Sequence, residues 1–444
     1  MSENRIDKNT LKIVLNDQLE NFKNTDPGIE RHQLKEVKKH LRSPFAVVFS
    51  GLRRVGKSTL LAQVAGKFYS NRYYYVNFED ERLLNFDAAD FDSLHETLVE
   101  LFGDKKVFFL DEIQNVTGWE RFVRRMIDRG FKFYLAGSNA SLLSRELGTK
   151  LTGRYLMIEL LPFSFSEFLR FKKISIPADL SILAAPARGK LKKEFNDYLT
   201  KGGIPDALKY PNSGWPKTLY EDVLFRDVAA RYKIDETKAL KELAFYLVSN
   251  VGRLISFNKL KDQLKLGSVN TVKNYIEYLS AGWLIFVVNQ YAWSVKKQQI
   301  AAKKIYGIDT GLVQEAGFAF SKNRGSLLEN LIFLQLRRRY NQIFYYRTEN
   351  NLEVDFYLPQ NKILIQVSQN LADSETRSRE VAGLRQAMAE IKANRGLILT
   401  EAEKETLKLN GSVIEIKPVF EWLLEKTKLR LLRNLRPPKN PDQT

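Results

Sequence analysis

The stretch that decides the fold is GLRRVGKST, from Gly51 to Thr59. It follows the apolar run Phe45–Phe49 and precedes Leu60–Phe68, which can continue as a helix. It fits the pattern G-x-x-x-x-G-K-[ST], whose glycines allow a tight loop with backbone N–H groups around a phosphate. A helix N-terminus at the end of the loop adds to this anion site. The sequence therefore predicts a nucleotide-binding loop formed by Gly51, Leu52, Arg53, Arg54, Val55, Gly56, Lys57, Ser58 and Thr59.

Four side chains carry the predicted chemistry. We expect Lys57 to reach the β- and γ-phosphates of the bound nucleotide and Ser58 to ligate Mg²⁺. The apolar run KVFFLDE ends in Asp111 and Glu112. We assign Asp111 to the Mg²⁺ shell and Glu112 to polarising the water that attacks the γ-phosphate. The alternative is an acidic pair that only favours a helix dipole, and it would prevail if the loop were absent.

Two further positions are candidates for sensing or stabilising the phosphate. Ser138 and Asn139 follow the next apolar run, so Asn139 can sense the γ-phosphate while Ser138 caps a helix. Arg154, in LTGR, is the candidate for stabilising transition-state charge, either within the chain or on a neighbouring copy. An ordinary solvated arginine is the alternative, and the competitors for the role are Arg53, Arg54 and Arg145.

Short apolar runs alternate with amphipathic segments between residues 41 and 165. The runs are apolar on both faces, which suits buried parallel strands joined by crossover helices. This is the pattern of a doubly wound α/β sheet. We expect a helix at Trp119–Arg129 and strands at Phe45–Phe49, Arg72–Phe78, Lys106–Glu112, Phe131–Ser138 and Tyr155–Leu161.

Six motifs together resemble those of the prokaryotic AAA-type ATPases that carry an uncharacterised nuclease-like C-terminal domain. They are GLRRVGKST, FLDEIQ, LAGSNASLL, LTGR, LPFSFSEFL and YLTKGGIPDAL. The resemblance extends from about residue 30 to 420 and implies ATP rather than GTP. It also implies an extra strand between the phosphate-loop strand and the Asp-Glu strand, a place that Arg72–Phe78 fits.

A helix-turn-helix pattern follows a mostly helical stretch. In SFNKLKDQLKLGSVNTVKNYIEYL, Gly267 suits the turn and Ser268 the N-cap, and the runs that follow suit the wing of a winged helix. Asn270, Thr271, Lys273 and Asn274 would then face duplex DNA, and Lys296, Lys297, Lys303 and Lys304 would add phosphate contacts. The alternative is a winged helix that serves only to join domains or copies.

The C-terminal part resembles a restriction-endonuclease-like domain of the PD-(D/E)xK pattern. Glu329 and Asp355 match the metal-binding acids of that pattern, whereas Gln366 and Ser368 stand where it has Glu and Lys. An amide is a poor ligand for hard metal ions, and serine supplies no cation. We therefore expect the fold to be retained and the nuclease to be lost. The basic run Arg337–Arg339 either binds nucleic acid or is a solvated helix face.

These readings divide the chain into six parts. We predict a helical segment at 1–40, the ATPase core at 41–165, a helical subdomain at 166–245, a winged helix at 246–312, the nuclease-like domain at 313–420 and a basic tail at 421–444. The fold class is accordingly α/β multidomain, with a P-loop NTPase sheet, a helical and winged-helix middle and a degenerate nuclease-like end.

Composition limits the function further. The 444 residues contain 70 Lys and Arg against 52 Asp and Glu, a net charge of +18 that favours a polyanionic partner. The absence of cysteine excludes disulfides, thiolate zinc sites and cysteine nucleophiles. No apolar run approaches the roughly 18 residues of a membrane span, and the polar N-terminus is unlike a secretory signal. We expect a cytoplasmic protein without membrane contact.

Three functions remain in competition. The first is an ATP-hydrolysing switch with ATP and Mg²⁺ as cofactors, coupled to duplex DNA or to a protein partner of the C-terminal domain. The second is a DNA-binding regulator in which nucleotide is a structural or regulatory ligand. The third, a metal-dependent nuclease, is disfavoured by Gln366 and Ser368. A ring or dimer follows if Arg154 acts on a neighbouring copy.

Overall fold

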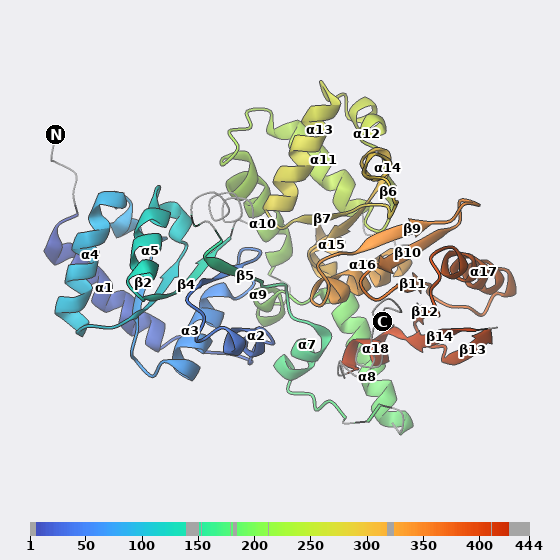
Figure 1. Ribbon diagram of the computed structural model, residues 1–444, viewed down its shortest axis with the longest axis horizontal. Helices are drawn as coiled ribbons and strands as arrows, with labels where there is room; N and C mark the ends of the chain where they lie inside the picture. Colours follow the sequence, from blue (N-terminus) through green and yellow to red (C-terminus); the bar gives the residue numbers. More distant parts are fainter. Residues whose placement is uncertain are drawn as a thin grey trace, which may run out of the picture.

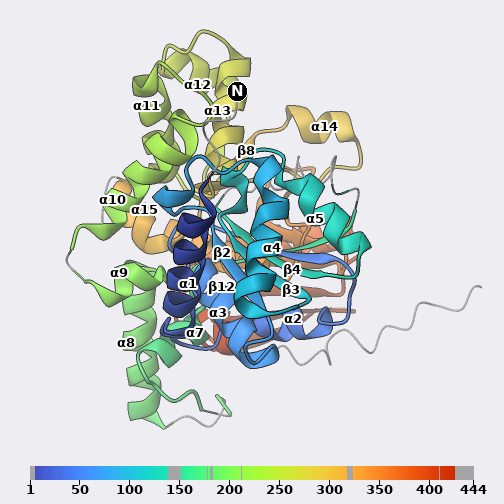
Figure 2. The same ribbon diagram turned by 90° about the vertical axis from the view of Figure 1, so that its left-hand side faces the viewer.

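A computed structural model describes residues 6–138, 151, 153–177, 179–180, 184–211, 213–317, 324–409 and 411–425. Figure 1 shows an N-terminal lobe built on one sheet and a C-terminal lobe built on another. The middle segment connects the two lobes; its helices α11 (Thr237–Ser249) and α13 (Val269–Ala281) rise above them, whereas α7 (Phe165–Phe171) and α8 (Ala185–Lys201) lie below. In the turned view of Figure 2, the short helix α14 (Val295–Ile300) projects from this middle segment. In the described part of the chain, no helix combines the length and the apolar character that crossing a membrane requires.

The N-terminal lobe contains a five-stranded sheet in which all strands are parallel. Alternate residues of β1 face opposite sides of the sheet, so both of its faces must be covered. Val47 and Phe49 pack with α3, and Ala46 and Val48 pack with residues of α4 and α5. The strands are β1 (Ala46–Ser50), β2 (Tyr74–Asn77), β3 (Val107–Asp111), β4 (Lys132–Gly137) and β5 (Tyr155–Glu159). The α-helices are α1 (Lys8–Lys23), α2 (Leu34–Lys39), α3 (Lys57–Phe68), α4 (Phe91–Phe102) and α5 (Trp119–Asp128).

The strand order corrects one expectation. The sheet runs β2-β3-β4-β1-β5, so the strand between the phosphate-loop strand and the Asp-Glu strand is β4. The expected occupant, Arg72–Phe78, forms β2 at the edge of the sheet beside β3. Chain order and strand order differ here because crossover connections can skip a position. The order places β3 and β4 next to each other, and β4 next to β1.

The middle segment is helical up to Ser249, as predicted. Its helices are α7 (Phe165–Phe171), α8 (Ala185–Lys201), α9 (Pro205–Lys209), α10 (Trp215–Asp222), the π-helix η4 (Val223–Ala229) and α11 (Thr237–Ser249). A three-stranded antiparallel sheet of order β6-β8-β7 follows. Its elements in chain order are β6 (Leu254–Ile255), α12 (Phe257–Gln263), α13 (Val269–Ala281), β7 (Ile285–Val288), α14 and β8 (Lys303–Gly307), followed by α15 (Thr310–Ala316).

The C-terminal lobe is a mixed six-stranded sheet of order β13-β14-β12-β11-β10-β9. The apolar pattern predicts helices at Leu327–Arg339 and Glu375–Lys392 and strands at Gln342–Arg347, Glu353–Leu358, Lys362–Val367 and Arg395–Thr400, and the structure has an element at each of these places. It does not predict the strands β13 and β14 or the helix α18. The helices are α16 (Arg324–Arg337), α17 (Ser374–Glu390) and α18 (Val419–Leu424). The strands are β9 (Phe344–Arg347), β10 (Glu353–Leu358), β11 (Ile363–Val367), β12 (Arg395–Thr400), β13 (Glu405–Leu409) and β14 (Ser412–Pro418).

The middle sheet and the C-terminal sheet are connected by backbone hydrogen bonds. The N–H of Tyr291 donates to the carbonyl of Tyr345 at 2.8 Å, and the N–H of Tyr345 donates to Asn289 at 3.1 Å. Gln290 and Tyr345 form a parallel bridge between the two sheets. The segment after β7 is therefore held by the edge strand β9 of the next domain.

Candidate functional site

The loop from Gly51 to Gly56 connects β1 to α3 at the carboxyl edge of the sheet. A Cβ at Gly51 would lie 2.3 Å from the carbonyl oxygen of Leu160, so only glycine fits there. Gly56 has φ +95°, a conformation that side chains disfavour. The buried Lys57 ammonium turns back onto the loop and donates to the carbonyls of Gly51 at 3.2 Å and Leu52 at 3.1 Å. The loop thus has the tight curvature that backbone binding of phosphate needs.

The first acidic residue, Asp111, ends β3 and is buried. Burial and the neighbouring charge of Glu112 raise the pKa of Asp111 to about 6, while a hydrogen bond with Ser58 works in the opposite direction. Tyr75 on the adjacent strand β2 also hydrogen-bonds Asp111. The raised pKa means that the surroundings disfavour the charged form of Asp111. A cation beside this carboxylate would favour the charged form, so Asp111 suits a cation site. The oxygens of Ser58 and Asp111 are donors that Mg²⁺ prefers, so these two residues fit the ion.

Glu112 has φ +47°, an uncommon backbone conformation for a residue with a side chain. Its carboxylate lies 3.8 Å from the Lys57 ammonium and accepts a hydrogen bond from Gln114. At the end of β4, the backbone N–H and hydroxyl of Ser138 donate to it at 3.4 and 3.3 Å. The structure therefore brings Lys57, Asp111 and Glu112 together at one edge of the sheet. Asn139, the predicted sensor, lies outside the described residues.

Arg154 lies at the edge of the sheet opposite the phosphate loop. It precedes β5, and its carbonyl accepts the N–H of Ala46, the first residue of β1. Its guanidinium contacts the Asp128 carboxylate at 2.6 Å. β1 has five residues, which places the two edges roughly 15 Å apart at about 3.3 Å per residue. In this arrangement Arg154 cannot reach a phosphate in its own loop, and only action on a neighbouring copy remains as a proposal.

The two loop arginines have partners that the sequence did not reveal. Arg53 donates to both oxygens of the buried Asp227, in η4, at 3.1 and 3.3 Å, and to Glu79 at 3.1 Å. Although burial acts to lower the pKa of Arg53, these carboxylates hold it above its ordinary value. Arg54 lies 3.6 Å from Asp206 and over the Trp215 ring at 4.3 Å. Both arginines therefore connect the phosphate loop to the helices that follow the sheet.

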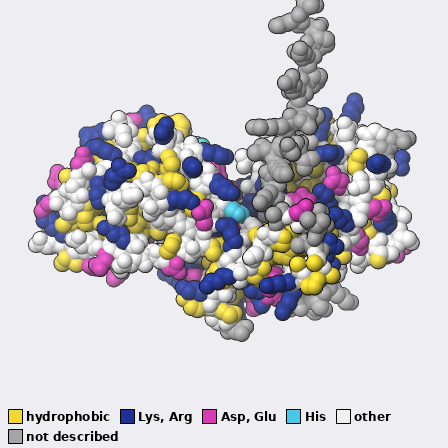
Figure 3. Space-filling model, turned by 90° about the horizontal axis from the view of Figure 1, so that it is seen from below, with side chains coloured by type: hydrophobic (Ala, Val, Ile, Leu, Met, Phe, Trp, Pro, Cys, Tyr) yellow, Lys and Arg dark blue, Asp and Glu magenta, His cyan; other side chains and the backbone are white. Residues whose placement is uncertain are grey.

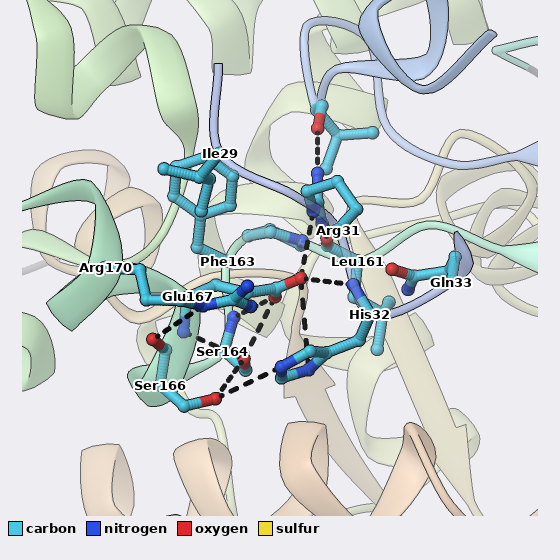
Figure 4. A network of polar contacts seen from close by, with 12 residues as sticks. Ile29, Arg31, His32, Gln33, Leu161, Phe163, Ser164, Ser166, Glu167 and Arg170 are labelled. Atoms are coloured by element: carbon cyan, nitrogen blue, oxygen red, sulfur yellow. Dashed lines mark hydrogen bonds and ion pairs between the residues drawn. The ribbon is translucent and has the colours of Figure 1, made fainter. Parts of the chain in front are cut away.

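A buried ion pair supports the loop from behind (Figure 4). Arg31 donates through Nε to Glu167 at 3.1 Å and through its two terminal nitrogens to the carbonyls of Val55 at 2.9 Å and Leu161 at 2.7 Å. Ser164 donates to Glu167 from its backbone N–H at 2.8 Å and its hydroxyl at 2.9 Å, completing the capping box of α7. The S-x-x-E spacing in LPFSFSEFL could have indicated this cap. No local pattern marks Arg31.

The predicted recognition residues lie on α13. Ser268 caps the helix by accepting the N–H of Thr271 at 3.0 Å, and Val272, Ile276 and Leu279 are buried, as expected. Asn270, Lys273 and Asn274 are exposed, whereas Thr271 is half-buried and shares the cap. On the connection between β7 and β8, Lys296 and Lys297 are exposed.

Two lysines expected on the wing surface are buried instead. The ammonium of Lys303 donates to the Gln298 carbonyl, and Lys304 points into the C-terminal lobe. The expectation that these residues contact phosphates is therefore wrong. Lys303 and Lys304 belong to a strand whose residues are all buried.

The acidic residues predicted in the C-terminal part do converge. Asp355 and Glu329 both contact the Lys304 ammonium, and the N–H of Asp355 donates to Gln366 at 3.2 Å. The amide of Gln366 turns to Glu380 at 2.6 Å, and the Ser368 hydroxyl donates to the Asn370 carbonyl at 2.9 Å. Across the described ranges, no three Asp, Glu, His or Cys side chains are arranged to hold a metal ion.

The basic run on α16 contacts the N-terminal lobe. Arg337 donates through Nε to Glu159, at the end of β5, at 2.9 Å, and Arg338 donates to the Pro162 carbonyl at 2.5 Å. Neither expected role, nucleic acid contact or a solvated face, fits these two residues. They lie where the two lobes meet. Figure 3 shows Lys and Arg side chains beside a His side chain where the two lobes meet.

Three family models match successive parts of the chain. Residues 43–169 match an AAA domain, and residues 192–322 and 324–419 match two domains of unknown function. The chain is similar to the Aeropyrum pernix ORC1 protein solved in complex with DNA, with 14% identity over 66% of this chain and 94% of that chain and a TM-score of 0.28.

Two relatives match most of the chain. An uncharacterised protein of Haemophilus influenzae is 28% identical over 86% of this chain and 94% of its own. Uncharacterized protein MJ1544 of Methanocaldococcus jannaschii is 35% identical, covering 85% of this chain and 88% of its own length. The match of residues 43–169 to an AAA domain lies in the N-terminal lobe. At this identity and coverage, the chain belongs to the same protein family as MJ1544.

Proposed function

We propose that this protein is a Mg²⁺-dependent ATP-hydrolysing switch that is coupled to duplex DNA or to a protein partner. The observation that carries the proposal is the meeting of Lys57, Ser58, Asp111 and Glu112 at one edge of the parallel sheet. Phosphoryl transfer depends mainly on positioning and charge stabilisation, and these four residues supply both. The AAA domain match over this region supports the same reading.

Each residue has a proposed task in hydrolysis. The backbone N–H groups from Gly51 to Ser58 hold the phosphates, and the Lys57 ammonium leaves the loop carbonyls to contact the β- and γ-phosphates. Glu112 accepts a proton from the attacking water, and Ser138 orients its carboxylate. Mg²⁺, held by Ser58 and Asp111, neutralises charge on the phosphates when it is bound.

The same loop offers a route to the rest of the molecule. Arg53 and Arg54 stand inside the phosphate-binding stretch and contact Asp227, Asp206 and Trp215 of the helical segment. A loop that rearranges around phosphate moves these contacts, so the helices respond to ATP binding and hydrolysis. This makes a switch a better fit than a simple hydrolase.

The test is steady-state ATP hydrolysis by the full chain with and without duplex DNA. We expect hydrolysis that requires Mg²⁺, is lost in Lys57→Ala and falls by about 10²-fold or more in Glu112→Gln, because that change removes the base. Glu79→Gln is the matched control, since Glu79 is an exposed carboxylate that contacts only Arg53 near the site. Hydrolysis equal to that of Lys57→Ala in the unmodified chain would refute the proposal.

DNA binding is the second candidate, favoured by the exposed face of α13. The order of α11, β6, α12, α13 and the β7–β8 hairpin supports a winged helix, in which the second helix of the pair enters the major groove. Asn270, Lys273 and Asn274 lie on that exposed face. In this alternative, the nucleotide is a regulatory or structural ligand and hydrolysis is slow.

DNA binding is measured in the same preparation by fluorescence anisotropy over a range of salt concentrations. Lys273→Ala combined with Lys296→Ala and Lys297→Ala should weaken binding and flatten its salt dependence, because each removed phosphate contact lowers the slope by about one. Lys408→Ala, an exposed lysine on β13, is the control. Binding that is insensitive to salt, or unchanged in the triple variant, would leave a protein partner of the C-terminal domain as the coupled component.

A further inference from the structure

A single buried lysine connects three carboxylates from two elements of the C-terminal lobe. Lys304 lies on β8, and its side chain is 1% exposed. Its ammonium nitrogen is 2.9 Å from Glu329 Oε1 on α16, 2.8 Å from Glu353 Oε1 and 2.7 Å from Asp355 Oδ1, both on β10. Three carboxyl oxygens thus surround one ammonium group at hydrogen-bond distance.

The surroundings keep these groups in place. Tyr306, two residues further on the same face of β8, donates its hydroxyl to Glu329 at 2.6 Å. The N–H of Val367 donates to the second oxygen of Asp355 at 2.9 Å. Asn330 accepts the N–H of Gly307 at 2.6 Å and donates to its carbonyl at 3.1 Å, which fixes α16 against β8. The cluster is therefore held on both sides of the boundary between the middle segment and the C-terminal lobe.

The charges show why a cation is needed at this point. Burial and then the charge of Asp355 raise the pKa of Glu329 to about 7. Burial would lower the pKa of Lys304, but Asp355 and Glu329 hold it well above its ordinary value, so the ammonium stays charged. Without that ammonium, three acidic side chains would face one another in a buried space, which is costly unless another cation replaces it.

We propose that Lys304 is an internal cation that takes the place of a divalent metal ion between Glu329, Glu353 and Asp355. As the described residues stand, no three carboxylates are arranged to hold a metal ion. The three oxygens lie within 2.9 Å of the Lys304 nitrogen, and they would have to move closer to one another to reach the 2.3–2.6 Å that Ca²⁺ and similar hard ions require. Both cations cannot occupy that point together. Lys304 thereby prevents a metal ion from binding between the three carboxylates. Its ion pairs also hold the C-terminal lobe against β8.

The test is Mn²⁺ binding to the full chain without nucleotide, measured by the electron paramagnetic resonance signal of the free ion and by thermal unfolding. Lys304→Ala should bind one more Mn²⁺ per chain than the unmodified protein, and Mn²⁺ should raise its unfolding temperature. Lys304→Ala combined with Asp355→Asn should lose both effects. Lys303→Ala is the matched control, because Lys303 is the neighbouring buried lysine and bonds a carbonyl outside the cluster.

Two outcomes would overturn the proposal. One is Mn²⁺ binding by the unmodified chain that Asp355→Asn removes, because the position would then accept metal beside Lys304. The other is a folded Lys304→Ala protein that binds no additional Mn²⁺. If Lys304→Ala does not fold, Lys304→Gln, which keeps a hydrogen-bond donor for the carboxylates, is titrated instead. Binding of Mn²⁺ at Ser58 and Asp111 is separated from these effects because it persists in Asp355→Asn.

Discussion

At the scale of single residues, Arg31 supports the phosphate loop although no sequence motif marks it. Its guanidinium makes three directed contacts, to Glu167, to Val55 in the phosphate loop and to Leu161 after β5. Arginine suits this position because its planar group can satisfy several acceptors at once. The back of the loop is thus fixed by a residue that lies before the sheet in the chain.

The first prediction concerns the acid of this pair. Burial would raise the pKa of Glu167, but the charge of Arg31 and the other donors hold it well below its usual range. A carboxyl with a lowered folded pKa stabilises the fold fully above its unfolded pKa of about 4.3, and this contribution is lost as pH falls. We expect Glu167→Gln to cost about 3–5 kcal/mol at pH 7, because Arg31 keeps its buried charge without a partner.

The measurement is urea denaturation at pH 7 and at pH 4. The difference between the unmodified chain and Glu167→Gln should be smaller at pH 4, where the acid of the unfolded chain is partly protonated. Glu30→Gln is the control, since Glu30 forms an exposed ion pair with Lys67 and should change stability by less than about 1 kcal/mol. A difference that is equal at both pH values would show that the charge of Glu167 is not the stabilising component.

At the scale of elements, the strands of the N-terminal sheet could be located from the sequence, but their order could not. A buried run such as KVFFLDE marks a strand through its composition alone. The neighbours of such a strand depend on the crossover connections, which leave no periodic signal. The sequence therefore placed β2 between β1 and β3, a position that β4 occupies in the structure. β13 and β14 were missed for a related reason, since they pair as a hairpin at the sheet edge, where part of the surface is exposed.

The candidate site, too, could be predicted only in part from the sequence. The residues of the phosphate loop and the acidic pair were predicted because their spacing along the chain is itself the signal. The partners of Arg53 and Glu112 were not, because Asp227 and Ser138 come from distant segments that only the fold brings close. For Arg154, action within the chain and action on a neighbouring copy both stayed open, because a motif does not show at which end of a strand it lies.

The second prediction concerns η4, the π-helix that receives Arg53. Such helices are rare and frequently occur at functional sites. We expect Arg53→Ala and Asp227→Ala each to reduce the response of the helices to ATP, and the double variant to be no worse than the single ones. The coupling energy should lie at about 0.5–3 kcal/mol, as for residues in direct contact.

The response is measured by limited proteolysis and hydrogen exchange of residues 205–229 with and without ATP. Arg226→Ala, an exposed arginine on the same π-helix, is the control and should leave the response unchanged. Effects of the two single variants that simply add would mean that the contact between Arg53 and Asp227 does not transmit the nucleotide state.

At the scale of the whole molecule, the two lobes contact each other directly as well as through the middle helices. Arg337, the last residue of α16, contacts Glu159, which ends the strand β5 beside the phosphate-loop strand. Arg338, the next residue, contacts Pro162, which follows β5. One apolar core extends from β1 through the middle helices to α16. A change at the phosphate loop therefore has two physical routes to the C-terminal lobe.

The third prediction concerns assembly. Because Arg154 lies at the edge opposite its own loop, Arg154→Ala should leave hydrolysis per chain unchanged at low protein concentration. If a neighbouring copy uses this arginine, the unmodified protein should become more active as its concentration rises, and Arg154→Ala should not. Sedimentation with and without ATP gives the state of association. A loss of activity in Arg154→Ala that is the same at every concentration would contradict the geometry.

The contact between β8 and α16 has a consequence for recombining relatives of this protein. Residues 192–322 and residues 324–419 match two different family models and are therefore separate regions of the sequence. Lys304 and Gly307 belong to the first region, and their partners Glu329, Asn330 and Asp355 belong to the second. A chimera that joins the first region of one relative to the second of another must carry both halves of this charge set. The two regions must therefore be exchanged together in an engineered chimera, although a boundary separates them in the sequence.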